Sequence, residues 1–230
     1  MMILHPKFFR GIGDGTIHVL AACALLFALS ACKKDQGPPD AIKSDAAVAK
    51  ATSLLSAEQY KRALDALAPA LQFRPDDPIV INVKGAILTK LKDYDGARAC
   101  YEKALKISPN FFAARYNNGA VLALEEKWDD AITYFRNLLI EEPDNELVEY
   151  KLLLLLLHQD SDEALQQKLF PSDIPSNTPA WYYATAARCY KNGKPEEAVK
   201  YLEVARSVFG DKTEIFQQEL DESGLNKIRK

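Results

Sequence analysis

The chain of 230 residues contains a short pattern that returns every 34 residues. In each copy a small residue is followed by an alanine, a larger apolar residue and a proline. The four columns are Ala51, Gly85 and Gly119; Ala63, Ala97 and Ala131; Leu67, Tyr101 and Phe135; and Pro75, Pro109 and Pro143. Four columns that share one period restrict the fold to an array of similar structural units.

Each unit has the side-chain pattern of two helices. Residues 101–107 place apolar groups at helical spacing, and Ser108, Pro109 and Asn110 follow. Proline has no amide hydrogen and disfavours the helical conformation in the residue before it, so that the helix ends there. The sequence therefore predicts helix–turn–helix units and an all-α fold.

This pattern resembles the tetratricopeptide repeat, a helix–turn–helix unit of 34 residues. The resemblance implies a right-handed α-solenoid of about five repeats, in which the first helix of each repeat lines a concave groove. The fourth repeat is degenerate, with Leu153 at the small position and Ala164 as the alanine of its second helix, one residue early. The expected repeats are 44–77, 78–111, 112–145, 146–178 and 179–212.

Three further segments complete the expected array over 44–222. The run Leu152 to Leu157 predicts a helix that is buried on several sides. The segment 170–179 is rich in proline and predicts a non-helical connection that closes the fourth repeat. Residues 212–220 predict a short capping helix over the apolar end that a solenoid exposes, and 223–230 form a tail.

The first 31 residues have the layout of a secretory signal peptide. Lys7 and Arg10 precede an apolar run that ends in small residues. From residue 19 to residue 31 this run has 13 residues, whereas a helix needs about 20 to span the hydrocarbon core. A permanent transmembrane helix is the weaker alternative for this segment.

Leu29-Ser30-Ala31-Cys32 resembles the lipobox of bacterial lipoproteins. The resemblance implies cleavage before Cys32 and acylation of its thiol, with Cys23 as the alternative site. Residues 32–43 have no apolar periodicity at their start and are expected to form a flexible tether. The expected location is the bacterial cell envelope; Lys33, where some retention signals have Asp, favours the outer membrane facing the periplasm in a Gram-negative cell.

Catalytic and nucleic-acid functions lack the residues that they need. Beyond residue 31, His158 is the only histidine, so that a histidine metal site or a Ser-His-Asp triad lacks parts; we expect a structural role for it. Cys100 and Cys189 are two repeats apart and are expected to be buried free thiols. With 29 basic against 32 acidic residues, no basic face for nucleic acid is expected. We predict no enzyme, no cofactor and no metal.

The expected groove is the best candidate for a binding site. One column of the first helices is rich in tyrosine and lies beside a column of mostly small residues, which suits a protein or peptide partner with apolar side chains. The carboxylate clamp of the family is a poor match, since only Asn117 fits and Lys151 substitutes partly for an arginine. The candidate groove residues are Asn82, Thr89, Tyr116, Asn117, Tyr150, Tyr183 and Tyr190.

Together these features predict a lipid-anchored, non-catalytic scaffold or adaptor that binds a protein or peptide partner in its groove. The alternative is a glycan- or peptidoglycan-binding envelope module. Trp181, Tyr182 and Tyr183 follow the proline-rich segment, and exposed aromatic rings there would stack on sugars. Packing of Trp181 and Tyr182 between the fourth and fifth repeats is the simpler interpretation of these residues.

Overall fold

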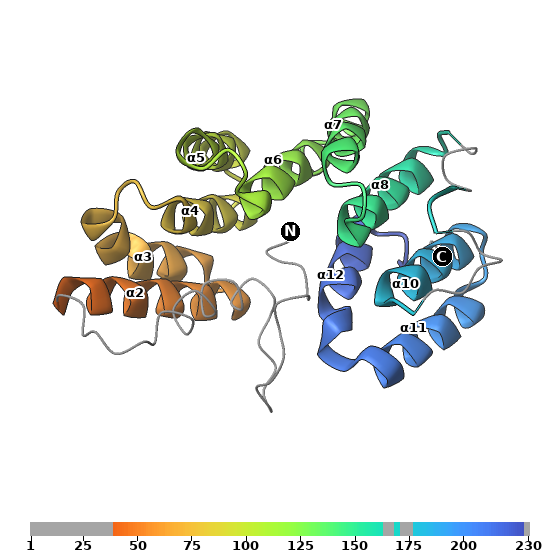
Figure 1. Cartoon of the computed structure of the whole chain (residues 1–230). Coiled ribbons are helices and arrows are strands. Elements are labelled where there is room, and N and C mark those ends of the chain that lie inside the picture. Colours follow the sequence, from red (N-terminus) through yellow and green to blue (C-terminus); the bar gives the residue numbers. More distant parts are fainter. Residues whose placement is uncertain (1–38, 163–167, 171–176, 228–230) are drawn as a thin grey trace. The chain divides into compact units, whose positions relative to one another are not determined.

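A computed structural model describes residues 39–162, 168–170 and 177–227 of the chain (Figure 1). All regular secondary structure in these ranges is helical, which confirms the predicted all-α class. The chain divides into two compact units, of which unit 1 ends at Glu125 and unit 2 begins at Glu126. The division falls inside the third expected repeat, between its first and second helices.

Unit 1 contains five described helices, two of which pair with the helix that follows them. The helices α2 and α3 form one hairpin, α4 and α5 form a second, and α6 packs on α5 and α4. Their bounds are α2 Pro39–Ser56, α3 Tyr60–Phe73, α4 Pro78–Lys90, α5 Tyr94–Ile107 and α6 Phe112–Leu124.

Unit 2 contains the rest of the described array. The helices α10 and α11 form a hairpin, α8 packs on α7 and α10, and α12 packs on α8 and α10. The bounds are α7 Trp128–Glu141, α8 Glu146–Gln159, α10 Pro179–Lys191, α11 Pro195–Phe209, the 3₁₀ turn η2 Gly210–Thr213 and α12 Glu214–Ser223. The expected second helix of the fourth repeat, with Ala164, lies mainly outside the described residues.

Capping side chains mark the starts of α4 and α8. Asp77 precedes Pro78, and its carboxylate accepts hydrogen bonds from the backbone amides of Ile79 and Val80 at 2.8 and 3.4 Å. The side-chain oxygen of Asn145 accepts hydrogen bonds from the backbone amides of Leu147 and Val148 in the first turn of α8. A side-chain acceptor satisfies amides that have no partner within the helix, and proline fits the first turn because its missing amide is not needed there.

The backbone after each first helix has a recurring geometry. A residue one or two positions past the end of each first helix has a positive φ angle, between 50° and 71°. In α4–α5 the amide of Asp93 then donates to the carbonyl of Leu88 at 3.0 Å, the hydrogen bond that closes a Schellman-type helix end. These residues are 34, 34, 34 and 33 positions apart, as the repeat pattern requires: Glu58, Lys92, Glu126, Asp160 and Gly193.

The hairpin α4–α5 shows why the small and large columns occur together. The Tyr101 ring is fully buried against Gly85, and a Cβ atom on Gly85 would lie 2.5 Å from Cε1 of that ring. The two helices therefore approach closely only because Gly85 has no side chain. The Tyr101 hydroxyl also lies 3.0 Å from the Thr89 hydroxyl, one turn along α4.

The two ends of the array compare differently with the expectations from the sequence. The tether predicted over 32–43 is wrong at its C-terminal end, because α2 already begins at Pro39, and proline is well tolerated in a first helical turn. The predicted C-terminal helix is present as α12. The signal peptide, Cys23 and Cys32 lie outside the described residues. Within the described ranges, none of the helices is long and apolar enough to cross a membrane.

Candidate partner-binding surface

The candidate groove residues all lie on first helices of the hairpins: two on α4, two on α6, one on α8 and two on α10. Most of them are buried. Tyr190 is partly exposed, whereas the other six have at most 3% of their surface exposed. The expectation of an open tyrosine-lined groove is therefore not met, and the contacts of each unit explain the burial separately.

In unit 1 two of the polar candidates are hydrogen-bonded to each other. The Asn117 side-chain amide on α6 donates to the side-chain oxygen of Asn82 on α4 at 3.2 Å. The Thr89 hydroxyl is bonded to the Gly85 carbonyl at 2.9 Å and faces Tyr101 of α5. Thr89 thus belongs to the interior of the hairpin and does not line a groove, because the ring that fills the space above Gly85 also reaches its hydroxyl.

In unit 2 the helix α12 covers the two candidate tyrosines. Phe216 packs its ring against Tyr150 of α8 and Tyr183 of α10, with ring centroids 5.5 and 6.0 Å apart. The Tyr183 hydroxyl donates to the Gln217 side chain at 3.3 Å. Burial raises the pKa of both tyrosines, so that these phenols are neutral. Figure 1 shows α12 beside α8 and α10.

The same face contains a buried ion pair. Nζ of Lys151 on α8 lies 2.6 Å from Oε2 of Glu219 on α12, and the two side chains are 8% and 0% exposed. Burial raises the pKa of Glu219, whereas the Lys151 ammonium lowers it through its charge and its hydrogen bond, and the pKa lies below its usual value. Lys151 was the partial match to a carboxylate clamp, and its carboxylate partner comes from within the chain.

The residues of α12 that make this contact were not identified from the sequence. Ile215, Phe216, Glu219 and Leu220 are all buried, at spacings that define one face of a helix. A glutamate in an otherwise apolar helical face is the signal that could have indicated a buried cation opposite it. From the apolar residues of this helix alone, the sequence predicted only that it covers the apolar end of the solenoid.

The aromatic cluster proposed for sugar stacking packs inside unit 2. Trp181 is 6% exposed and lies against Tyr201 of α11, with ring centroids 6.0 Å apart. Tyr182 lies against Phe209 at the end of α11, at 5.7 Å. The rings join α10 to α11 within the fifth repeat. They do not form an exposed platform, so the glycan alternative loses the feature that suggested it.

The remaining reactive side chains have structural surroundings. The His158 ring stacks on Trp128 of α7, with centroids 4.1 Å apart and planes inclined by 20°. Cys100 and Cys189 are both free thiols, of which Cys100 is buried and Cys189 is partly exposed. Among the described residues, no group of three or more His, Cys, Asp or Glu side chains has the arrangement of a metal site. The run Leu152 to Leu157 is buried, as predicted.

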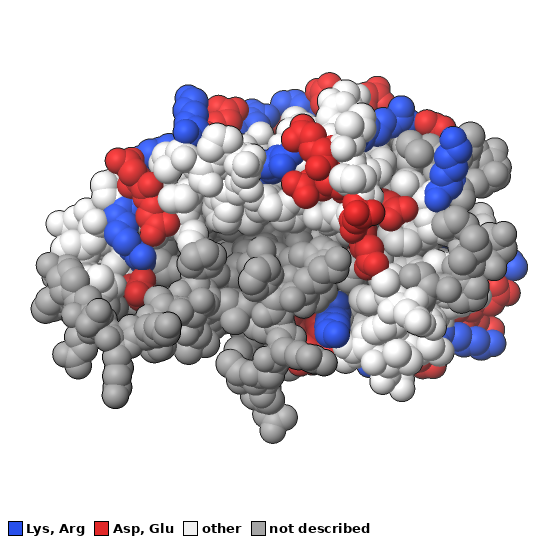
Figure 2. Space-filling model, viewed as in Figure 1, with Lys and Arg blue, Asp and Glu red and all other residues white. Residues whose placement is uncertain are grey.

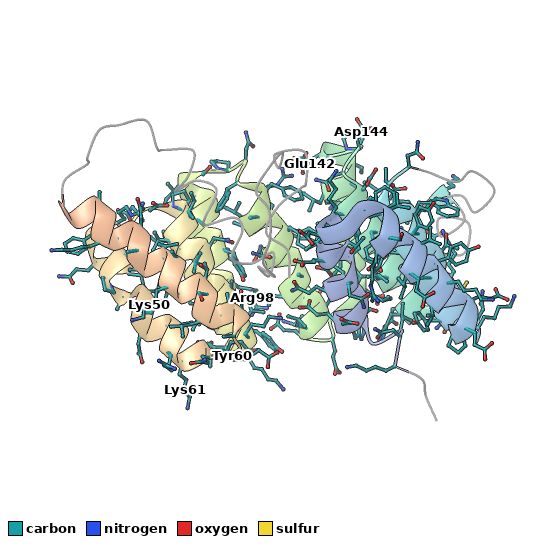
Figure 3. All side chains as sticks on the ribbon, turned by 90° about the horizontal axis from the view of Figure 1, so that it is seen from below. Lys50, Tyr60, Lys61, Arg98, Glu142 and Asp144 are labelled. Carbon is teal, nitrogen blue, oxygen red and sulfur yellow. The ribbon has the colours of Figure 1, made fainter. Side chains whose placement is uncertain are left out.

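Charged side chains of both signs cover the outer parts of each unit. In the view of Figure 2, basic and acidic residues are interspersed along the helices of either unit. Figure 3 places Lys50 and Lys61 on the α2–α3 hairpin of unit 1, and Glu142 and Asp144 at the turn between α7 and α8 of unit 2. These charges lie at helix surfaces and turns.

Comparison with known proteins agrees with the hairpin architecture. A family model for the tetratricopeptide repeat matches residues 85–125. The peroxisomal targeting signal receptor of Candida albicans is 40% identical over 62 residues, which are 27% of this chain and 10% of the receptor. The human protein O-mannosyl-transferase TMTC1 is 32% identical over 102 residues, which are 43% of this chain and 12% of the transferase.

The solved structures extend this similarity over most of the fold. A tetratricopeptide repeat protein from Parabacteroides merdae superposes with a TM-score of 0.61 at 17% identity, covering 89% of this chain and 77% of that protein. This similarity concerns the fold, whereas the chain spans only about a tenth of the two curated relatives named above. The helical hairpins thus have the fold of a tetratricopeptide-repeat array, and the family model matches one stretch of it, residues 85–125.

Proposed function

We propose that this protein is a non-catalytic, lipid-anchored adaptor that binds a helical segment of a partner protein at the bacterial cell envelope. The repeat architecture supports the adaptor role, since stacked helical hairpins present first-helix faces on which peptides bind. The lipobox-like segment that ends at Cys32 is the support for the anchor and the location.

One observation carries the binding function. In unit 2 the first-helix face formed by α8 and α10 already holds a helix, α12, through two aromatic contacts and one charged contact. A face that accommodates a helix of its own chain has the shape and the polar group needed for a helix. The binding surface is therefore assigned to α8 and α10, with Tyr190 at its partly exposed end.

The anchor is tested by metabolic labelling with a clickable fatty acid. Replacing Cys32 by serine should abolish labelling of the protein, because the thiol that would carry the lipid is lost. Replacing Cys23 by serine is the matched control and should leave labelling unchanged. Labelling that persists in Cys32→Ser and disappears in Cys23→Ser would move the anchor to Cys23. If the unchanged protein takes up no label, the anchor is refuted.

The binding surface is tested by photo-crosslinking in native membranes. A photoreactive amino acid replaces Tyr190 on α10 in one protein and Lys200, an exposed residue of α11, in the control. We expect one discrete crosslinked partner from position 190 and none from position 200. Equal capture at both positions, or capture only at position 200, would contradict the assignment of the α8–α10 face.

A further inference from the structure

The contact between α12 and the α8–α10 face shows the features of a ligand in its site. The inward side of α12 offers an aromatic ring at Phe216 and a carboxylate at Glu219, three positions later. The face offers two buried tyrosines and a lysine to receive them. Helices that bind in grooves use anchors on one face at such short spacings.

The buried ion pair contributes specificity more than stability. Moving Lys151 and Glu219 out of water has a desolvation cost that offsets much of their attraction, so that apolar residues of similar size would hold α12 at least as well. An ion pair does, however, discriminate strongly between ligands, because a helix without the carboxylate leaves the lysine buried opposite an apolar group. A face with a buried lysine is therefore expected to select a helix that has a carboxylate.

A glycine precedes and a glycine follows the segment that contains α12. Gly210 ends α11 with φ 55° and ψ −133°, a conformation that residues with a Cβ rarely adopt, and Gly224 ends α12 with φ 71°. Between them lie one 3₁₀ turn and a helix of 10 residues. A helix this short is marginal in water by itself, so that α12 depends on the face that it covers.

We propose that α12 is a displaceable internal ligand of the α8–α10 face, and that the partner is a helical segment with an aromatic residue and a carboxylate three positions later. The inference rests on the proposed adaptor function and specifies its partner. A partner segment of this kind replaces Phe216 between Tyr150 and Tyr183 and replaces Glu219 beside Lys151. The face is covered until such a segment competes with α12.

The test uses the whole chain and a fluorescein-labelled synthetic peptide of residues 211–225. Phe216→Ala in the chain weakens the hold on α12, and fluorescence anisotropy measures peptide binding. We expect the peptide to bind the Phe216→Ala chain at least about tenfold more tightly than the unchanged chain. Gln218→Ala is the control, since this side chain contacts Glu222 on its own helix, and it should behave as the unchanged chain does.

The charged contact gives a second readout. A peptide with Glu219→Gln should bind the Phe216→Ala chain about tenfold or more weakly, because it loses a charge-assisted hydrogen bond. If Phe216→Ala does not melt cooperatively, a chain with Glu219→Gln, which changes only the charge, takes its place. The proposal is overturned if the peptide binds the unchanged chain and the variant chain equally well. It is also overturned if the peptide does not bind a variant chain that melts cooperatively.

Two other results are informative. A stable dimer of the opened chain that excludes the peptide would assign the face to α12 of a second copy and overturn the proposal. Peptide binding measures the internal ligand, whereas membrane crosslinking at position 190 measures the partner. If a partner is captured at position 190 but the peptide does not bind, the adaptor function stands and this inference is wrong. If the peptide binds but no partner is captured, the face holds α12 as a displaceable ligand and the adaptor function is wrong.

Discussion

In unit 1 the amide of Asn117 donates to Asn82 between two first helices, whereas in unit 2 Lys151 on a first helix donates to Glu219 on α12. Both pairs are buried, but the first is neutral and lies within the repeat array, and the second is charged and needs a helix from outside the array. The units thus share a construction and differ in what completes their first-helix faces. The repeat pattern specifies the helical hairpins, and the residues between the pattern positions decide the chemistry of the face.

The largest expected effect is on the charged pair. Glu219→Leu leaves Lys151 buried without its carboxylate, and the free energy of unfolding should fall by about 3–5 kcal/mol. The double variant Lys151→Met/Glu219→Leu should recover most of this loss, because apolar groups pack there without desolvation cost. Urea denaturation measures both. A double variant as unstable as the single one would show that the ion pair itself, and not the unpaired lysine, stabilises unit 2.

Acidification is a milder form of the same change. The pKa of Glu219 is lower in the folded protein than its ordinary value of about 4.3. Its contribution to stability is therefore complete above the unfolded pKa and is lost as the pH falls through the folded pKa. Between about pH 6 and pH 3, the unchanged protein should lose more stability in urea titrations than Glu219→Gln does. If the two proteins lose the same amount of stability, the protonation of Glu219 does not contribute to acid denaturation.

A smaller effect is expected in the α4–α5 hairpin of unit 1. Gly85→Ala places a methyl group 2.5 Å from the buried Tyr101 ring, and the helices must move apart. The cost of such overpacking is about 1–3 kcal/mol, measured by urea denaturation. Adding Tyr101→Leu should relieve part of it. If Gly85→Ala stabilises the protein through better helix propensity, the close approach is not what the glycine column requires.

The neutral pair of unit 1 should matter less than the charged pair of unit 2. Asn82→Ala removes the acceptor of the Asn117 amide, and we expect a loss of about 1 kcal/mol in the urea experiment. The comparison between the units requires this loss to be smaller than that of Glu219→Leu. A loss of equal size would mean that both faces depend on their polar pairs to the same degree.

The smallest effects concern the turns that the two units share. Gly193→Ala puts a Cβ on a residue with φ 71° and should cost about 1 kcal/mol. Lys92→Gly, at the equivalent turn with φ 64°, relieves that strain but makes the unfolded chain more flexible, so that its effect should be within a few tenths of a kcal/mol. Thermal melts of the two variants provide the measurement; equal and large effects would indicate contacts at these turns beyond the backbone.

The helices α4 and α10 begin at residues 78 and 179, where the repeat pattern starts its second and fifth copies. The reason is that the relevant signals are local: a capping aspartate, a proline and a glycine act on their own helix or its neighbour. The candidate site was predicted less well. Thr89 was assigned to the groove, although its hydroxyl faces Tyr101 across the hairpin.

The sequence by itself determined that this chain folds into helical hairpins and which small residues let the paired helices approach. Those features depend on side-chain volume and backbone preference over fewer than 34 residues, and they recur often enough to be read. Only the tertiary structure decided that α12 covers Tyr150 and Tyr183 and that Lys151 meets Glu219, 68 residues away. That contact occurs once in the described chain and joins distant segments, so that no period or local preference encodes it.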